Sequence, residues 1–125
     1  MGSDNTTTVP GLSNVSNAMV RLFKDHFGRG PTKTRSYYAG PNMLICVLED
    51  SFTPAELSML KMGEHERLRD TRLFFQHATE DEFRQTVENI IGRPVISFGR
   101  ATDTTTDTSF EIFTFGPLPE DATNS

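Results

Sequence analysis

The chain has 125 residues, a formal net charge of −5 and 35% hydrophobic residues. This length suits one domain of about 100–150 residues, and ten phenylalanines and five methionines supply large apolar side chains for a core. The acidic balance argues against a general electrostatic coat for nucleic acid, although a local basic patch is still compatible with it. No apolar run approaches the roughly 20 residues that span a bilayer, and no secretory leader opens the sequence, which predicts a cytoplasmic protein without membrane insertion.

The two ends of the chain are polar and contain little apolar surface that could offset the entropy of ordering them. Residues 1–12 and 117–125 are therefore predicted to be flexible tails on either side of a single domain over residues 13–116.

The first element of this domain is an amphipathic helix. Ser13 is a favourable N-cap, apolar residues recur at helical spacing as far as Phe27, and Gly28 is a typical residue for the end of a helix. Residues 28–31 form a loop, because Pro31 lacks a backbone donor and restricts the residue before it.

A β-hairpin follows this loop. Residues 34–39 contain strand-forming side chains, residues 40–42 are a Gly-Pro-Asn turn cluster, and residues 43–48 read Met-Leu-Ile-Cys-Val-Leu. The second strand shows no alternation of apolar and polar residues, which predicts a central strand buried on both faces.

Two helical segments come next. Thr53, Pro54 and Glu56 form a capping-box pattern at the start of a short helix that ends at Gly63. Residues 64–91 then hold one broad apolar stripe and predict a single long helix of about 42 Å. A second capping-box pattern at residues 79–82 marks the place where this helix would bend.

The last two strands are predicted over residues 95–102 and 108–115, around a polar loop at residues 103–107. In the final strand, Phe110 and Ile112 share one face whereas Phe113 and Phe115 share the other. Either a bulge turns all four side chains inward, or both faces of this strand are covered.

The order α-β-β-α-α-β-β predicts an α+β fold with a four-stranded antiparallel sheet and helices packed on one face. The strands at residues 43–48 and 108–115 have apolar residues on both faces, yet the three helices of a small chain can cover only one face of the sheet. We therefore expect a homodimer that shelters the second face.

The candidate site lies in a basic segment. Residues 21–35 carry five basic side chains and one acid, which gives a local charge of +4. Next to Gly28 and Gly30, where backbone N–H groups are approachable, Arg29 is suited to contact a small anion, a phosphate or a protein partner. The alternative is that these residues only shape a turn and carry solvated charges. Arg72, at the border of the apolar stripe, is suited to reach a carboxylate or a bound anion.

Other residues give no catalytic, metal or cofactor prediction. The histidines His26, His65 and His77 lack metal-ligand spacing. Cys46 lies in the apolar run, where burial makes a thiol a poor nucleophile. Asp103 and Asp107 flank three threonines in a loop with too few ligands for calcium, which favours a solvated hairpin.

Four motifs in this order resemble the MpsC family, and the resemblance covers about residues 13–116. They are the Gly-Arg-Gly-Pro loop at residues 28–31, Phe-Thr-Pro-Ala-Glu-Leu at 52–57, Ile-Gly-Arg-Pro-Val at 91–95 and Glu-Ile-Phe-Thr-Phe at 111–115. The family usually has leucine where this chain has Phe52, which we expect to alter packing only.

The resemblance implies a small cytosolic protein of a sodium-translocating system that generates membrane potential. It defines no catalytic residues, and the matching positions that suggest a ligand or partner site are Gly28, Arg29, Gly30, Pro31, Arg35 and Arg72. We therefore expect a non-enzymatic accessory or regulatory protein linked to sodium or bicarbonate transport, with a membrane transport subunit or a small anion as its partner.

Two other functions stay open on the sequence. The first is a nucleic-acid-binding module with residues 21–35 on phosphates and Tyr37 or Tyr38 stacked on bases, a partner that the acidic chain disfavours. The second is an enzyme acting on small anionic metabolites, for which a perturbed carboxylate or histidine in a pocket near Arg29 would be the sign.

Overall fold

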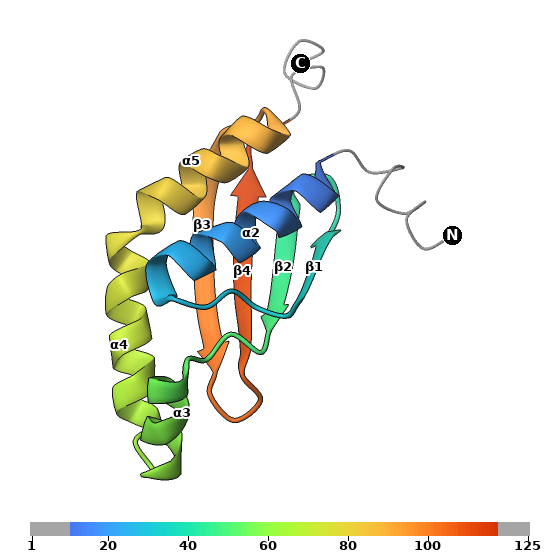
Figure 1. The fold of residues 1–125 in the computed structure, drawn as a ribbon. Coiled ribbons are helices and arrows are strands. Elements are labelled where there is room, and N and C mark those ends of the chain that lie inside the picture. The colour runs from blue at the N-terminus through green and yellow to red at the C-terminus, as the bar shows by residue number, and fades with distance from the viewer. Residues whose placement is uncertain (1–10, 118–125) are drawn as a thin grey trace.

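The computed structural model describes residues 11–117, so the predicted flexible tails lie almost entirely outside the described residues. The elements along the chain (Figure 1) are α2 (Leu12–Phe27), β1 (Lys33–Tyr38), β2 (Met43–Glu49), α3 (Pro54–Lys61), α4 (His65–Ala78), α5 (Glu80–Ile91), β3 (Val95–Asp103) and β4 (Thr108–Phe115). No helix among these residues combines the length and apolar character needed to cross a membrane.

The four strands form one antiparallel sheet in the order β1-β2-β4-β3. Helices α2 and α5 lie across one face of this sheet, α4 continues from α5 along the β3 side, and α3 packs beside α4 (Figure 1). The predicted α+β class, with a four-stranded antiparallel sheet and helices on one face, is confirmed. The homodimer stays a prediction.

The ends of the helices follow local signals only in part. Gly28 adopts φ 87° at the end of α2, as predicted, and Thr53 and Glu56 form the complete capping box of α3. The predicted N-cap at Ser13 is wrong, because α2 begins at Leu12 after Gly11. The Val15 N–H donates to the Gly11 carbonyl, and the added residue Leu12 packs on the core.

The predicted single helix over residues 64–91 is broken at Thr79, between α4 and α5. The capping box expected here does not form, since the Thr79 hydroxyl donates back to the Phe75 carbonyl at 2.8 Å. The break leaves the Gln76 carbonyl free to accept from Arg100 at 2.9 Å. A basic side chain at a helix C-terminus is favourable because it meets the negative end of the helix dipole.

The two faces of the sheet differ in burial, which corrects two predictions. In β2, Leu44, Cys46 and Leu48 are fully buried beneath the helices, whereas the alternate residues are only half-buried, so this strand is not buried on both faces. In β4, Phe113 and Phe115 point to the buried side without any bulge in that strand; the bulge lies in β3, between Val95 and Ser97.

We call the side beneath the helices the inner face and the other side the outer face. Residues of the outer face are Lys33, Arg35, Tyr37, Met43, Ile45, Val47, Glu49, Ser97, Gly99, Ala101, Asp103, Thr108, Phe110, Ile112 and Thr114. The core forms between the inner face and the apolar sides of α2 and α5, whose buried residues include Met19, Phe23, Phe83 and Val87.

Candidate functional site

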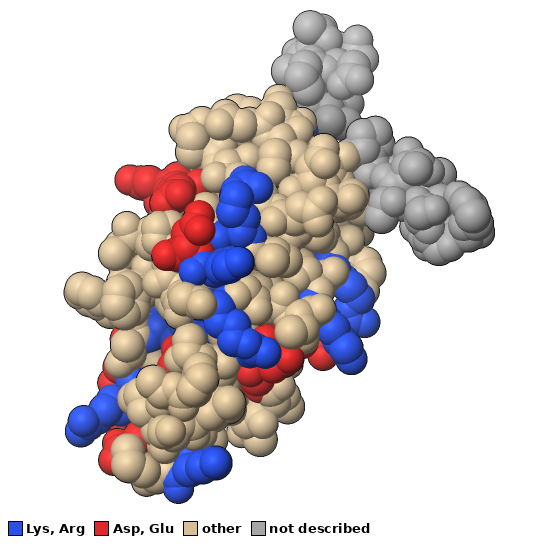
Figure 2. Space-filling model, in the orientation of Figure 1, with Lys and Arg blue, Asp and Glu red and all other residues tan. Residues whose placement is uncertain are grey.

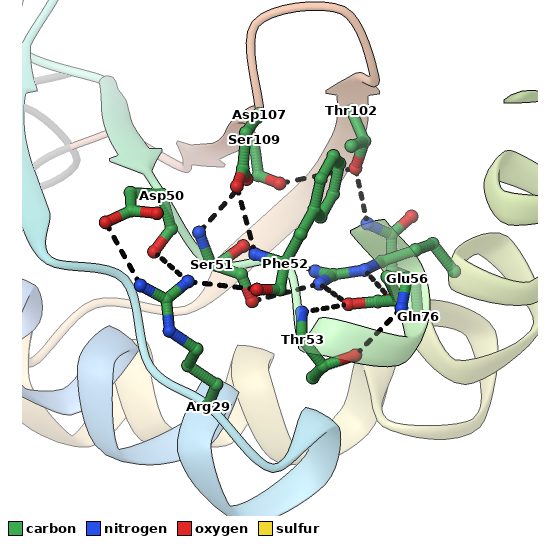
Figure 3. Close-up of polar contacts among 11 residues, drawn as sticks. Arg29, Asp50, Ser51, Phe52, Thr53, Glu56, Gln76, Thr102, Asp107 and Ser109 are labelled. Carbon is green, nitrogen blue, oxygen red and sulfur yellow. Dashed lines mark hydrogen bonds and ion pairs between the residues drawn. The ribbon is translucent and has the colours of Figure 1, made fainter. Parts of the chain in front are cut away.

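The loop predicted as the site packs closely on α2. A Cβ atom at Gly30 would lie 2.9 Å from the Val20 carbonyl oxygen, so glycine permits this close approach. The Arg29 guanidinium donates to the carbonyls of Asp50 and Phe52 at 2.8 and 3.0 Å and forms an ion pair with the Asp50 carboxylate at 3.1 Å. Arg29 therefore anchors the connection between β2 and α3, residues 50–53, which Figure 3 shows at its centre.

Arg72, from α4, binds the same connection from within the molecule. Its guanidinium donates twice to the Glu56 carboxylate at 2.7 Å and once to the Ser51 carbonyl at 3.3 Å. The aromatic rings of Phe27 and Phe52 lie 4.4 and 4.9 Å from its central carbon. Arg72 is only 1% exposed, so its charge is balanced by a bidentate carboxylate and by two aromatic faces.

The carboxylate of Glu56 has two roles, since it also completes the capping box by accepting from the Thr53 N–H at 2.9 Å. Burial by itself would raise the pKa of Glu56, but the hydrogen bonds from Arg72 and from the Thr53 backbone outweigh it and hold that pKa below its usual value. The start of α3 and the middle of α4 are thus joined through one carboxylate.

A third side chain holds the β2–α3 connection from the hairpin loop. The Asp107 carboxylate accepts from the N–H groups of Ser51 and Phe52 at 3.0 and 3.1 Å, opposite the side from which Arg29 approaches (Figure 3). Asp50 and Asp107 both adopt positive φ, at 62° and 53°. The Arg29 hydrogen bond, with help from Thr32, lowers the pKa of Asp50. The Asp107 carboxylate is therefore structural, a role that its loop composition did not indicate.

The predicted site residues do not all meet. The structure brings Arg29 and Arg72 together on the β2–α3 connection, with residues 28–31 beside it. Arg35 instead lies on the outer face, where it pairs with Glu49 at 2.7 Å. Binding of a ligand by the 28–31 loop stays a prediction, and the hydrogen bonds of Arg29 and Arg72 supply a structural reason for both residues.

A second buried ion pair, missed by the sequence interpretation, joins Arg100 of β3 to Glu111 of β4. Arg100 Nε lies 2.7 Å from Glu111 Oε1, and the two side chains are 6% and 0% exposed. The central carbon of the Arg100 guanidinium lies 4.1 and 4.9 Å from the ring centroids of Phe83 and Phe98. The alternation of β4 could have revealed Glu111, since it shares a face with Phe113.

Burial dominates the titration of this pair. It raises the pKa of Glu111 to about 7, although Arg100 opposes the rise, and it lowers the pKa of Arg100 against the opposing effect of Glu111. No hydrogen bond from the described residues reaches either oxygen of Glu111. At neutral pH the carboxylate is therefore only partly ionised, and part of the charge on Arg100 is left unbalanced.

A groove follows the seam between α4 and β3, above these buried pairs. Its central cavity, of about 340 Å³, is lined by Arg69, Asp70, Arg72, Leu73, Gln76, Arg100, Ala101 and Thr102. A cavity of about 390 Å³ continues it toward Thr104, and a smaller one of about 120 Å³ continues it toward His77. We call this feature the arginine groove, because Arg69, Arg72 and Arg100 all contribute to its wall.

The polar groups of the arginine groove include hydrogen-bonded donors and hydroxyls, and one carboxylate, that of Asp70, also lines it. Gln76 Nε2 donates to the Thr102 hydroxyl at 3.4 Å, and Arg69 donates to the Thr104 hydroxyl at 3.3 Å. Arg69 is exposed and forms no ion pair with any residue between 11 and 117. Its single long hydrogen bond leaves most of its guanidinium donors available for a ligand.

The basic segment 21–35 is partly neutralised by the fold. Arg29 and Arg35 pair with Asp50 and Glu49, and His26 contacts Glu82 at 2.7 Å. Figure 2 shows basic side chains along α2 and the following loop beside acidic side chains over α5, which gives a mixed surface. This mixed surface does not favour the alternative that residues 21–35 bind nucleic acid.

The remaining candidate groups have structural environments. Cys46 is fully buried, as expected from its place in the apolar run, and burial raises its pKa to about 12. His65 contacts the Thr104 hydroxyl at 2.7 Å. Within residues 11–117, no three His, Cys, Asp or Glu side chains cluster as metal ligands do. The one strongly perturbed carboxylate, Glu111, lies beside Arg100 rather than Arg29, and its oxygens are closed to solvent.

Comparisons with known proteins agree with the sequence motifs. Residues 12–116 match the family model described as "Na+-translocating membrane potential-generating system (MpsC)". No curated protein and no solved structure shows significant similarity to the chain. The family match spans all eight helices and strands that the structure describes, so the likeness concerns the whole fold. The chain belongs to the MpsC family.

Proposed function

We propose that this chain is a non-enzymatic accessory component of a Na⁺-translocating system that generates membrane potential, and that it binds a small anion in the arginine groove. The family description supports the link to this system. The observation that carries the anion site is the convergence of three arginines, from α4 and β3, on one cavity of about 340 Å³. A cavity of this size accommodates a small oxyanion or carboxylate together with water.

Three arginines against one carboxylate, Asp70, in the lining of the arginine groove favour an anion over a cation. Arg69 supplies exposed donors at the mouth, and Gln76 and Thr102 supply polar groups on the wall. Beneath them, the charge of Arg100 is only partly neutralised, because burial raises the pKa of the adjacent Glu111 carboxylate to about 7. Charge-assisted hydrogen bonds from guanidinium groups to oxyanions are about twice as strong as neutral ones. Because Arg69 is the exposed arginine with donors available, we expect it to contribute most to anion binding.

The test is calorimetry on the full chain at low ionic strength, with phosphate, bicarbonate and sulfate as separate probes. We expect at least one of them to bind, and Arg69→Met to weaken its binding by about tenfold or more. Arg67→Met is the matched control, since Arg67 lies on the same helix but pairs with Glu64 away from the groove. Absence of binding by all three anions, or equal loss in both variants, overturns the anion site.

The pH dependence provides a second readout. With sulfate, whose charge is constant near neutral pH, affinity should increase as the pH falls through about 7, because protonation of Glu111 leaves Arg100 unbalanced. This increase should be absent in Glu111→Gln. Affinity that is constant across this range in the wild-type chain would contradict the contribution of Arg100.

The accessory role is tested separately, in cells that contain the whole system. Deletion of the chain should reduce the membrane potential measured with a potential-sensitive dye, and the wild-type chain and Arg67→Met should restore it. If deletion leaves the potential and its sodium dependence unchanged, the accessory role fails, whatever the calorimetry shows. If Arg69→Met restores the potential fully, the anion site has no part in that role.

A further inference from the structure

The outer face of the sheet is apolar at its centre and is left uncovered by the helices. Its central strands present Ile45, Val47, Phe110 and Ile112, all half-buried, and the edge strand β1 adds Tyr37, which is 47% exposed. Helices α2 and α5 lie on the opposite face, and α4 lies beside the β3 edge with α3 packed against it (Figure 1). A contiguous apolar sheet face of this kind is typical of an interaction surface.

The register of the strands arranges the outer face in rows that cross the sheet from β1 to β3. The first three rows contain Lys33, Glu49, Thr108 and Asp103; then Arg35, Val47, Phe110 and Ala101; then Tyr37, Ile45, Ile112 and Gly99. The β1 edge is therefore basic and bulky, whereas the β3 edge carries an acid and two small residues.

This arrangement is complementary to itself. A two-fold axis that lies between two facing sheets, parallel to the strands, places β1 of one copy over β3 of the other and keeps each row opposite the same row. Lys33 then faces Asp103 of the second copy, and Tyr37 lies over Gly99. In the centre, Ile45 and Val47 meet Ile112 and Phe110, so that apolar side chains contact apolar side chains.

We propose that two copies of this chain pair through their outer faces about such an axis. The proposal gives the homodimer expected from the sequence a specific surface and orientation. It does not rest on the anion site, but the two surfaces adjoin, because Ala101 belongs to the outer face and also lines the arginine groove. An axis perpendicular to the strands is disfavoured, because it would place β1 over β1, with Arg35 near its own copy, and would set the charged row over Met43. The four charged side chains of the face sum to zero, which suits self-association.

The size of the face places the dimer among the small interfaces. Four strands about 4.8 Å apart, each about seven residues long at about 3.3 Å per residue, give a projected area of roughly 450 Å². Two copies therefore bury roughly 900 Å² of projected area. Because side chains make the real surface rougher than its projection, the total accessible area buried is about 1,000–1,200 Å², at the lower end of specific interfaces. We expect a dissociation constant in the micromolar range.

The decisive variant is Gly99→Tyr. A Cβ atom at Gly99 would meet no atom within 4 Å, and the backbone there does not require glycine, so the monomer should fold with nearly unchanged stability. In the dimer the new ring would collide with Tyr37 of the second copy. The double variant Tyr37→Ala/Gly99→Tyr exchanges bulky and small residues between the two edges and should restore pairing. Ala55→Tyr, on exposed α3, is the matched control.

The measurement is sedimentation equilibrium from about 1 to about 200 µM, with thermal unfolding of each variant as a check on folding. We expect the wild-type chain and Ala55→Tyr to dimerise alike, Gly99→Tyr to weaken dimerisation at least tenfold, and the double variant to recover to within about threefold. A wild-type chain that stays at 14.0 kDa throughout overturns the proposal. So does a Gly99→Tyr chain that folds and dimerises as the wild type does, because pairing would then use another surface.

Discussion

Replacing Arg72 with methionine removes a buried charge while keeping a long apolar side chain between Phe27 and Phe52. The variant loses two hydrogen bonds of 2.7 Å to Glu56, one of 3.3 Å to the Ser51 carbonyl and one of 3.5 Å to the Ser51 hydroxyl. Removal of one partner from a buried ion pair typically destabilises a protein by about 3–5 kcal/mol. Glu56 is 14% exposed and keeps its hydrogen bond from the Thr53 backbone, so we expect the lower end, about 3 kcal/mol.

This loss should depend on pH with a defined sign. In the wild-type chain the pKa of Glu56 is held below its usual value, so its contribution to stability is present above the unfolded pKa and is lost as the pH falls through the folded pKa. In Arg72→Met, burial is left to disfavour the charged carboxylate. The difference in unfolding free energy between the two chains should therefore be largest near pH 7 and should shrink in acid, once Glu56 is protonated in both.

Urea denaturation followed by circular dichroism at pH 7 and pH 4 measures these differences. Arg29→Met is the comparison, because its ion pair with Asp50 is far more exposed, so its loss should cost clearly less than the loss of the Arg72 contacts. Glu56→Gln, combined with Arg72→Met, should reduce the penalty, with a coupling of about 2 kcal/mol between the two positions. The reasoning is refuted if Arg72→Met costs no more than Arg29→Met, or if the coupling is zero.

Three further predictions concern other features. Since the pKa of Glu111 is about 7 when folded and 4.5 in its ordinary state, the unfolding free energy of the wild-type chain should fall by roughly 3 kcal/mol as the pH rises from about 4.5 to about 7. Glu111→Gln should remove this component in urea titrations; an equal decline in both chains would contradict it. Thr53→Ala should lower the unfolding free energy by about 1 kcal/mol through loss of the α3 cap, and no loss would show that the cap adds nothing beyond the Glu56 contacts. The Cys46 thiol should react with a thiol reagent only at the rate of unfolding, so rapid labelling of the native chain at pH 8 would contradict its burial.

Local signals were sufficient for the ends of several elements. The box of Thr53 and Glu56, the left-handed Gly28 and the turn at residues 40–42 each depend on neighbours within a few positions. Backbone groups at such places are satisfied by side chains nearby, so the pattern itself predicts the geometry. Ser13 shows the limit of these signals, because packing of Leu12 on the core extended the helix past an otherwise favourable cap.

The candidate site could be predicted only in part. Arg29 and Arg72 were recognised as unusual from a glycine-rich loop and from the border of an apolar stripe, but their partners lie 21 and 16 residues away, at Asp50 and Glu56. Arg100 and Glu111 were missed altogether. A buried arginine requires a hydrogen-bond acceptor, but the sequence does not identify which residue provides it, because that depends on how the helices pack on the sheet.

By itself, the sequence determined most of the elements, their order and the antiparallel sheet, because hydrophobic periodicity, caps and turns act over short stretches of chain. The family followed from the resemblance of four motifs in their order. Only the tertiary structure decided that α4 and α5 separate at Thr79, where Arg100 donates a hydrogen bond to the Gln76 carbonyl. It also decided that three arginines line one groove, and which side of β2 and β4 the helices cover. Those outcomes depend on contacts between residues distant along the chain, whose energies are fixed by burial and by the charges that packing brings together.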